Sequence, residues 1–227
     1  MARSGAATIE QIIEAAEQLF GQYGPYGVSL RQIGRAAGAA NNFAVQFHFK
    51  DRDGLIAAIF ERRLAQFEAQ RKVMLDKATE NGRTPSVRDL LEIIKTPFIE
   101  QVSADGRHSY AAFMAGLHHF GLTSVRDRLA GSAPVTVQLT KMLADSLPDL
   151  SPKQFRSRFQ AVNTMILTTI SQLPATGGRA AFNDVISIAA AALQADARSN
   201  APAAAGDAPE RAASTGKARG RKTSRAS

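Results

Sequence analysis

Apolar residues recur at helical spacing along almost the whole chain. The first such stripe consists of Ile9, Ile12, Ile13, Ala16, Leu19, Phe20 and Tyr23, at intervals of one, three and four. Period-two alternation of β-branched residues is almost absent. The pattern predicts an all-α fold in which each helix buries one face.

Capping residues divide this pattern into separate helices. Thr8 with Gln11 and Ser29 with Gln32 have the spacing of capping boxes, Asp51 can cap a following helix, and Ser151 precedes a proline at a first helical position. We therefore expect helices near residues 8–23, 29–37, 41–47, 52–75, 86–104, 110–117, 122–129, 135–147, 151–173 and 179–197. Pro97 should kink its helix.

Composition excludes several kinds of protein. The 227 residues include no Cys, so disulfides and thiolate metal sites are excluded and a cytoplasmic protein is expected. No His/Asp/Glu set has metal-ligand spacing, and we expect no cofactor. We see no signal peptide. The charge-free run 159–178 contains Asn163, Gln172 and Pro174, which are too polar for a lipid-facing span, so no membrane partner is expected.

Positive charge is concentrated at the C-terminus. The net charge is +8, and residues 199–227 contain six basic residues and only two acidic ones. These residues are rich in Ala, Pro, Gly and Ser without apolar periodicity, which predicts a disordered basic tail. The tail would attract DNA through counterion release, or would be solvated without a role.

Two apolar stripes on residues 52–75 predict a helix shared by two packing units. Leu55 and Ile59 face one way, whereas Ile56 and Phe60 face another. The expected organisation is an N-terminal domain at 1–50, a larger helical domain at 51–198 and the tail at 199–227. The N-terminal domain would contain three helices, two of them only about two turns long.

Such short helices bury little apolar surface, and a helix–turn–helix that reads DNA explains their geometry. Side-chain amides at the start of the third helix suit base edges, and basic residues suit phosphates. The candidate DNA-binding residues are Ser29, Arg31, Asn41, Asn42, Gln46, Phe47, His48, Lys50 and Arg52. Phe43, Val45 and Phe49 are better explained as core.

Structural interpretations of the same residues remain open. Asn41 and Asn42 can be caps of a short helix in an ordinary bundle. His48 can pack in the core instead of touching phosphate, and Phe47 suits either place.

The region 9–60 resembles the DNA-binding region of TetR-family transcriptional regulators. The resemblance rests on "IIEAAEQLFGQYG", "VSLRQIGRAAG", "AVQFHF" and "KDRDGLIAAIF", in that order. Ala40-Asn41-Asn42-Phe43 departs from the family's usual small-basic-Gly start of the third helix. The resemblance implies an all-α homodimer with an N-terminal helix–turn–helix and a C-terminal domain for ligand binding and dimerisation. It also implies repression that a small molecule relieves.

Two further groups of residues are candidates in the C-terminal domain. Aromatic and Met side chains near Pro97 suit an apolar effector pocket, with plain core as the alternative; they are Phe67, Phe98, Phe113, Met114, Leu117 and His118. Nearly charge-free stripes on the last two helices suit a four-helix dimer interface, the alternative being burial within one chain. Their residues are Phe155, Phe159, Val162, Ile166, Ile170, Phe182, Val185 and Ala189.

The sequence thus predicts a DNA-binding transcriptional regulator, a repressor released by an unknown effector, that binds a near-palindromic operator as a homodimer. An activator and an architectural DNA-binding protein without effector are the alternatives. An enzyme is not expected, because no nucleophile elbow, phosphate-binding loop or paired catalytic carboxylates stand in the sequence.

Overall fold

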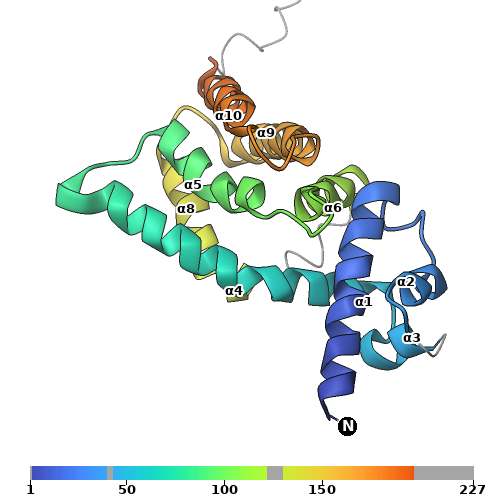
Figure 1. Cartoon of the computed structure of the whole chain (residues 1–227). Helices are drawn as coiled ribbons and strands as arrows, with labels where there is room; N and C mark the ends of the chain where they lie inside the picture. Colours follow the sequence, from blue (N-terminus) through green and yellow to red (C-terminus); the bar gives the residue numbers. More distant parts are fainter. Residues whose placement is uncertain (1, 40–42, 122–129, 197–227) are drawn as a thin grey trace, which may run out of the picture. The chain divides into compact units, whose positions relative to one another are not determined.

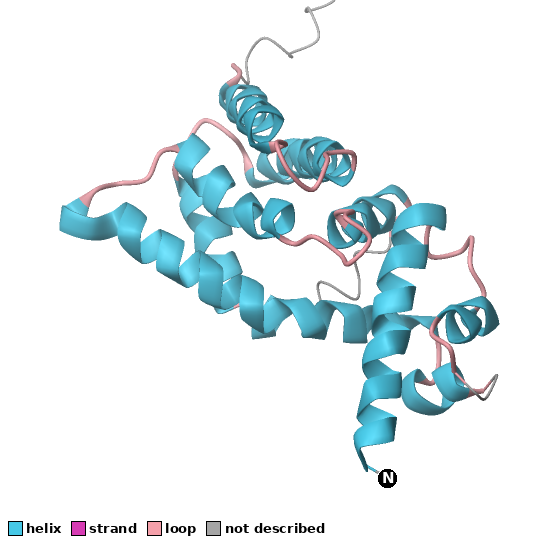
Figure 2. Cartoon of the chain, viewed as in Figure 1, coloured by secondary structure: helices cyan, strands magenta, loops and turns pink. Residues whose placement is uncertain are grey.

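The computed structural model describes residues 2–39, 43–121 and 130–196, and in these ranges every regular element is helical, as predicted (Figures 1 and 2). The α-helices are α1 (Ala2–Tyr23), α2 (Leu30–Ala36), α3 (Ala44–Phe49), α4 (Arg52–Thr79), α5 (Val87–Glu100), α6 (Ser109–His119), α8 (Pro134–Asp145), α9 (Pro152–Ser171) and α10 (Arg179–Gln194). Two 3-10 turns, η1 (Glu80–Gly82) and η2 (Ala130–Ser132), lie between them.

The chain divides into two units, Met1–Ala195 and Asp196–Ser227, and the described helices all lie in the first. The predicted tail at 199–227 and the predicted helix at 122–129 lie outside the described residues. Among the helices that are described, none is long and apolar enough to cross a membrane.

Helix starts follow the predicted caps with one exception. The Ser29–Gln32 box is complete, the Asp51 carboxylate accepts from the Gly54 amide, and Ser151 caps α9. The predicted cap at Thr8 is wrong, because α1 begins at Ala2 and Thr8 lies inside it. Backbone bonds to the preceding turn replace the side-chain cap there.

Helix α4 packs on α1 and α3 and also on α5 and α8, as its two stripes predicted. It is four residues longer than expected, and Leu55, Ile56, Ile59 and Phe60 are all buried. Because one continuous helix serves both groups of neighbours, a displacement at either end can be transmitted along it.

Helix α6 packs against helices from both ends of the described chain. It packs on α1 through one face and on α9 through another, and α9 in turn packs on α10. Helix α10 also contacts α5, and α8 contacts α4 and α5. The N-terminal helices are therefore joined to the rest of the unit through α6 as well as through α4.

The stripes that were expected to await a dimer partner are already covered within the chain. Six of the predicted interface residues are less than 6% exposed: Val162, Ile166, Ile170, Phe182, Val185 and Ala189. The mutual packing of α9, α10, α5 and α6 buries these faces, which agrees with the alternative of burial within one chain. The other two, Phe155 and Phe159, are half-buried and stack on each other at 5.4 Å between ring centroids.

Candidate nucleic-acid interface and ligand cavity

The start of α2 is fixed by a reciprocal pair of hydrogen bonds. The Gln32 backbone amide donates to Ser29 Oγ at 3.2 Å, and the Ser29 amide donates to Gln32 Oε1 at 2.9 Å. The Ser29 hydroxyl also donates to Gln32 Oε1 at 2.8 Å. Ser29 and Arg31 remain on the surface at this end of α2, where an anion such as phosphate is favoured.

Helix α3 has one fully buried side chain, with Ala44 and Phe49 partly buried beside it. Val45 is 1% exposed and packs against α2, where a side chain at Gly34 would have its Cβ 3.4 Å from Val45 Cγ2. Gln46 is exposed, and Phe47 is 83% exposed. The helix therefore presents an amide and an aromatic ring outward from a close-packed base.

Two aromatic positions at α3 differ from their core assignment. Phe43 is 68% exposed, so its prediction as core is wrong, whereas Val45 is buried as expected and Phe49 packs partly buried against the core. A six-residue helix offers only one inward face, and Val45 occupies it. Asn41 and Asn42 lie outside the described residues.

The junction between α3 and α4 is a strained turn that carries a cation. Lys50 has φ 66° and ψ −60°, and the Asp51 amide donates to the Phe49 carbonyl at 2.7 Å, which together define the rare positive-φ γ-turn. A Cβ at Gly54 would lie 2.1 Å from that same carbonyl oxygen. Glycine is thus required at position 54, and Lys50 stands exposed beside the reading helix.

The Arg52 side chain is held by contacts within the N-terminal region. Its Nη1 donates to the Val28 carbonyl at 2.9 Å, and its guanidinium lies 5.8 Å from the Phe20 ring centroid and 5.6 Å from that of Tyr26. His48 is half-buried between the rings of Phe47 and Phe49. Of the candidate DNA-binding residues that the structure describes, Ser29, Arg31, Gln46, Phe47 and Lys50 are exposed on α2, α3 and the turn after it.

Residues 12–59 match the family model described as bacterial regulatory proteins of the tetR family. This range runs from within α1 to within α4 and contains the whole helix–turn–helix. Residues 12–59 are thus similar to the DNA-binding region of the TetR family. Members of this family are DNA-binding transcriptional regulators and not enzymes.

One solved structure similar to this chain is described as a TetR-family transcriptional regulator from Rhodococcus sp. It shares 17% sequence identity with a TM-score of 0.46, and the match covers 81% of this chain and 98% of that one. A search of curated proteins found no significant match.

A cavity of about 840 Å³ lies among the helices from α4 to α9. It is walled by residues of α4, α5, α6, α8 and α9, which include Phe60, Phe67, Phe98, Tyr110, Met114, His118, Phe155 and Phe159. Four of the six predicted pocket residues line it, namely Phe67, Phe98, Met114 and His118. Phe113 and Leu117 do not, because they project from another side of α6, where Phe113 stacks on Phe20 of α1.

Sequence reasoning missed the polar members of the cavity wall. Arg71 is 5% exposed, donates to the Ile94 carbonyl at 2.8 Å and to Thr136 Oγ1 at 2.8 Å, and lies 3.6 Å from Glu68. Glu68 accepts from the Val135 amide at 2.7 Å at the start of α8. This network ties α4 to α5 and α8, and it places a guanidinium beside the aromatic rings.

Burial controls the ionisation of two residues in the wall. Burial lowers the pKa of Arg71 from its ordinary value, while Tyr110 and Glu68 act in the opposite direction. Burial also raises the pKa of Tyr110 well above its ordinary value, so its phenol stays protonated at neutral pH. No cluster of three or more potential metal ligands occurs in the part of the chain that the structure describes.

Helix α6 joins this cavity to the DNA-binding helices. Tyr110, Met114 and His118, spaced by four, line the cavity, whereas Ser109 faces α1 and donates to the Glu17 carboxylate. The same carboxylate accepts two hydrogen bonds from Arg63 of α4, at 2.9 and 3.0 Å. Three helices thus meet at one buried charge.

Proposed function

We propose that this protein is a transcriptional repressor that binds a near-palindromic operator as a homodimer and is released by a small-molecule effector. The observation that carries the proposal is the exposure of Gln46 and Phe47 on α3, a helix anchored by Val45 inside the family-matched region. A buried anchor with an exposed amide suits a helix whose partner is the major groove.

The remaining exposed residues suit contacts to the DNA backbone. Ser29 and Arg31 at the start of α2 and Lys50 after α3 flank the reading helix. Phosphate contacts of this kind fix the orientation of a reading helix without selecting a sequence. We assign them positioning roles, and we assign base contacts to Gln46 and Phe47.

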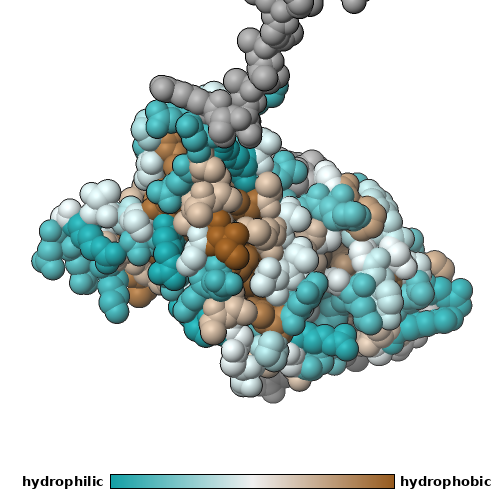
Figure 3. All heavy atoms as spheres, turned by 90° about the horizontal axis from the view of Figure 1, so that it is seen from above, coloured by the Kyte–Doolittle hydropathy of each residue, from teal (hydrophilic) through white to brown (hydrophobic). Residues whose placement is uncertain are grey.

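Dimerisation would use the outward faces of α9 and α10. Ile188 is 51% exposed, and Ala161, Thr168 and Ala192 are also exposed on these two helices. The side of the molecule that carries α9 and α10 in Figure 1 has hydrophobic surface in its middle (Figure 3). Two copies joined there would present two reading helices, which must lie roughly 34–36 Å apart to enter successive major grooves.

Effector binding would act through α6. A ligand in the cavity touches one face of α6, and the opposite face packs on α1. A shift of α6 would therefore move α1 and the reading helix it supports. The effect on operator affinity can be no larger than the ligand's differential affinity for the two conformations.

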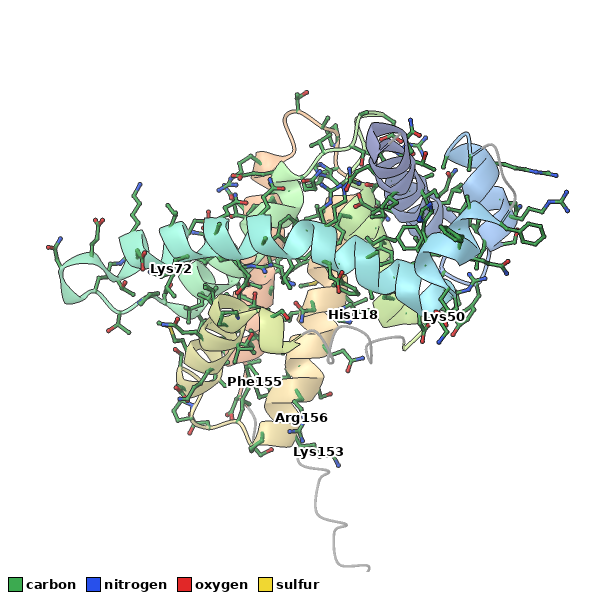
Figure 4. The ribbon with its side chains drawn as sticks, turned by 90° about the horizontal axis from the view of Figure 1, so that it is seen from below. Lys50, Lys72, His118, Lys153, Phe155 and Arg156 are labelled. Atoms are coloured by element: carbon green, nitrogen blue, oxygen red, sulfur yellow. The ribbon has the colours of Figure 1, made fainter. Side chains whose placement is uncertain are left out.

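The decisive experiment selects the binding sequence from random duplexes with the full-length protein and then measures affinity by fluorescence anisotropy. Gln46→Ala and Phe47→Ala should each weaken binding to the selected duplex by about 1–3 kcal/mol while sparing non-specific DNA. Lys72→Ala is the control for both variants. Lys72 is exposed and lies near the end of α4 that is far from Lys50 and α3 (Figure 4).

Each alternative predicts a different result. Selection of no sequence, with uniform footprints along any duplex, would support an architectural protein. A selected sequence whose affinity survives both α3 substitutions would contradict the assignment of α3 as the reading helix. A reporter driven from the selected sequence separates repression from activation.

A further inference from the structure

The cavity has two chemically different walls. Helices α4, α5 and α6 supply aromatic rings, with Phe67, Phe98 and Tyr110 in mutual contact at 5.1–5.5 Å between centroids. Helix α9 supplies Arg156, Gln160, Asn163 and Leu167, at spacings of four, three and four, beside the rings of Phe155 and Phe159. Such spacings place the first four side chains on one helix face. Three of these four are polar: Arg156 and Gln160 are exposed, and Asn163 is buried.

Asn163 is the deepest polar group of that face. It is 6% exposed, and its buried Oδ1 has no hydrogen-bond partner among the described residues. A buried polar atom without a partner costs about 1–3 kcal/mol, and native proteins satisfy nearly all such atoms with protein, water or ligand. Since Asn163 lines the cavity, its Oδ1 can accept a hydrogen bond from an N–H or O–H group of a ligand.

Positive charge lines both the interior and the rim. Lys95 is 4% exposed and its Nζ lies 5.3 Å from the Phe98 ring centroid, inside the cavity. Arg156 is an exposed member of the lining (Figure 4). No Asp or Glu lines the cavity within the described ranges 2–39, 43–121 and 130–196.

The exposed lining residues show where a ligand enters. Val137 and Lys141 of α8 and Arg156 and Gln160 of α9 are exposed, whereas Phe67, Phe98 and Tyr110 are buried. In Figure 4, Phe155 and Arg156 lie near the start of α9 beside α8. An anion approaching between α8 and α9 would meet the exposed cations Lys141 and Arg156, and cations at the rim favour its capture.

We propose that the effector is a hydrophobic organic acid, whose aromatic or alkyl body lies on the α4–α6 wall and whose carboxylate interacts with Lys95 and Arg156. This inference rests on the proposed function and specifies the ligand of the same regulator. The cavity volume of about 840 Å³ lies within the roughly 300–1,000 Å³ of small-molecule sites. A cationic ligand would have to leave water for a site that already holds the buried side chain of Lys95, which is costly.

The test is calorimetric titration of the full-length protein with ligands that share a body and differ in charge. Naphthoate is compared with naphthamide and naphthylmethylammonium, and decanoate with decanamide. The acid of at least one series should bind about tenfold or more tighter than its amide, as a charge-assisted hydrogen bond implies. The cation should bind most weakly.

Two substitutions locate the charge. Arg156→Gln and Lys95→Met should each reduce acid affinity about tenfold or more and leave amide affinity nearly unchanged. Lys153→Gln is the control for Arg156→Gln, because Lys153 is an exposed cation in the first turn of α9 and lies outside the cavity lining (Figure 4). Retained amide binding shows that the Lys95→Met protein is folded around an intact cavity.

Three results would overturn the inference: no acid binds, an amide or the cation binds as tightly as its acid, or the acid preference survives both substitutions. None of these titrations contains DNA. If the selection experiment yields no operator but the acids bind better than the amides, only the proposed function is refuted. If an operator is selected but the acids show no preference, only the assignment of the ligand is refuted.

Discussion

The two faces of α6 are packed in opposite ways. Towards α1 the contact is so close that a Cβ at Gly21 would lie 2.9 Å from the Ser109 carbonyl oxygen and 3.0 Å from Ala112 Cβ. On another side, Tyr110, Met114 and His118 border a cavity of about 840 Å³, although α6 also packs on α9. A helix that is tight on one side and hollow on the other can respond to a ligand and pass its movement to α1 with little loss.

The largest expected effect comes from removing the buried charge on the tight side. Glu17→Gln leaves Arg63 without its carboxylate partner, and breaking a buried pair in this way costs about 3–5 kcal/mol. The side chain of Glu17 is only 1% exposed, so water cannot replace the lost contact. Chemical denaturation followed by circular dichroism measures the change in the free energy of unfolding.

Glu10→Gln provides the control for this prediction. Glu10 pairs with Arg62 at 3.0 Å on the same two helices, but its side chain is 59% exposed. Exposed pairs contribute about 0–1 kcal/mol, so this substitution should change stability little. Equal losses for the two variants would show that the α1–α4–α6 junction does not depend on a buried charge.

The next largest effect is expected at Gly21, where α1 approaches α6 closely. Gly21→Ala gains about 1 kcal/mol of helix propensity but forces α1 away from α6, and overpacking of this kind costs about 1–3 kcal/mol. We expect a net loss of stability together with weaker operator binding, because α1 supports the reading helices. Unfolding experiments and anisotropy on the selected operator measure the two effects.

Gly116→Ala is the control for Gly21→Ala, because it raises helix propensity without a close contact between helices. Gly116 lies in α6, and its Cβ would meet nothing closer than the Phe20 carbonyl oxygen at 3.7 Å, an ordinary contact. This variant should gain up to about 1 kcal/mol. If both alanines stabilise the protein, the α1–α6 contact is looser than the close approach at Gly21 implies.

The local parts of this fold could be predicted from sequence, because their causes lie within a few residues. The caps at Ser29, Asp51 and Ser151 and the turn at Gly38 depend on spacings of three or four and on backbone conformation. The start of α1 was missed because a continuing helix competes with a cap and the sequence offers both. Exposed Phe43 was missed because α3 has room for one buried side chain only.

The interface and the cavity wall depend on which helices meet, and periodicity does not contain that information. An apolar stripe such as Val162–Ile166–Ile170 looks the same whether another subunit or the chain's own α6 and α10 covers it. Lys95 and Asn163 lie among buried apolar residues of α5 and α9, and the periodicity of these helices gives no sign of what surrounds the two side chains. Arg52 likewise could not be matched to Phe20 and Tyr26 before α1 and α4 were seen to cross.

The smallest expected effect concerns Asn163, a polar residue that lines the cavity. Asn163→Leu replaces an amide whose Oδ1 has no partner with an apolar group of similar size, and should raise the free energy of unfolding by about 1 kcal/mol. For a protein of this length that corresponds to a rise of about 2–4 °C in Tm, measurable by calorimetry without ligand.

Gln160→Leu, one turn before Asn163 on the same face but exposed, should produce no such gain. A fall in Tm for Asn163→Leu would mean that the amide is already satisfied by bound water. The cavity beside α6 would then be hydrated, and water would satisfy its polar groups without a ligand. The two faces of α6 would in that case differ only in how tightly they are packed.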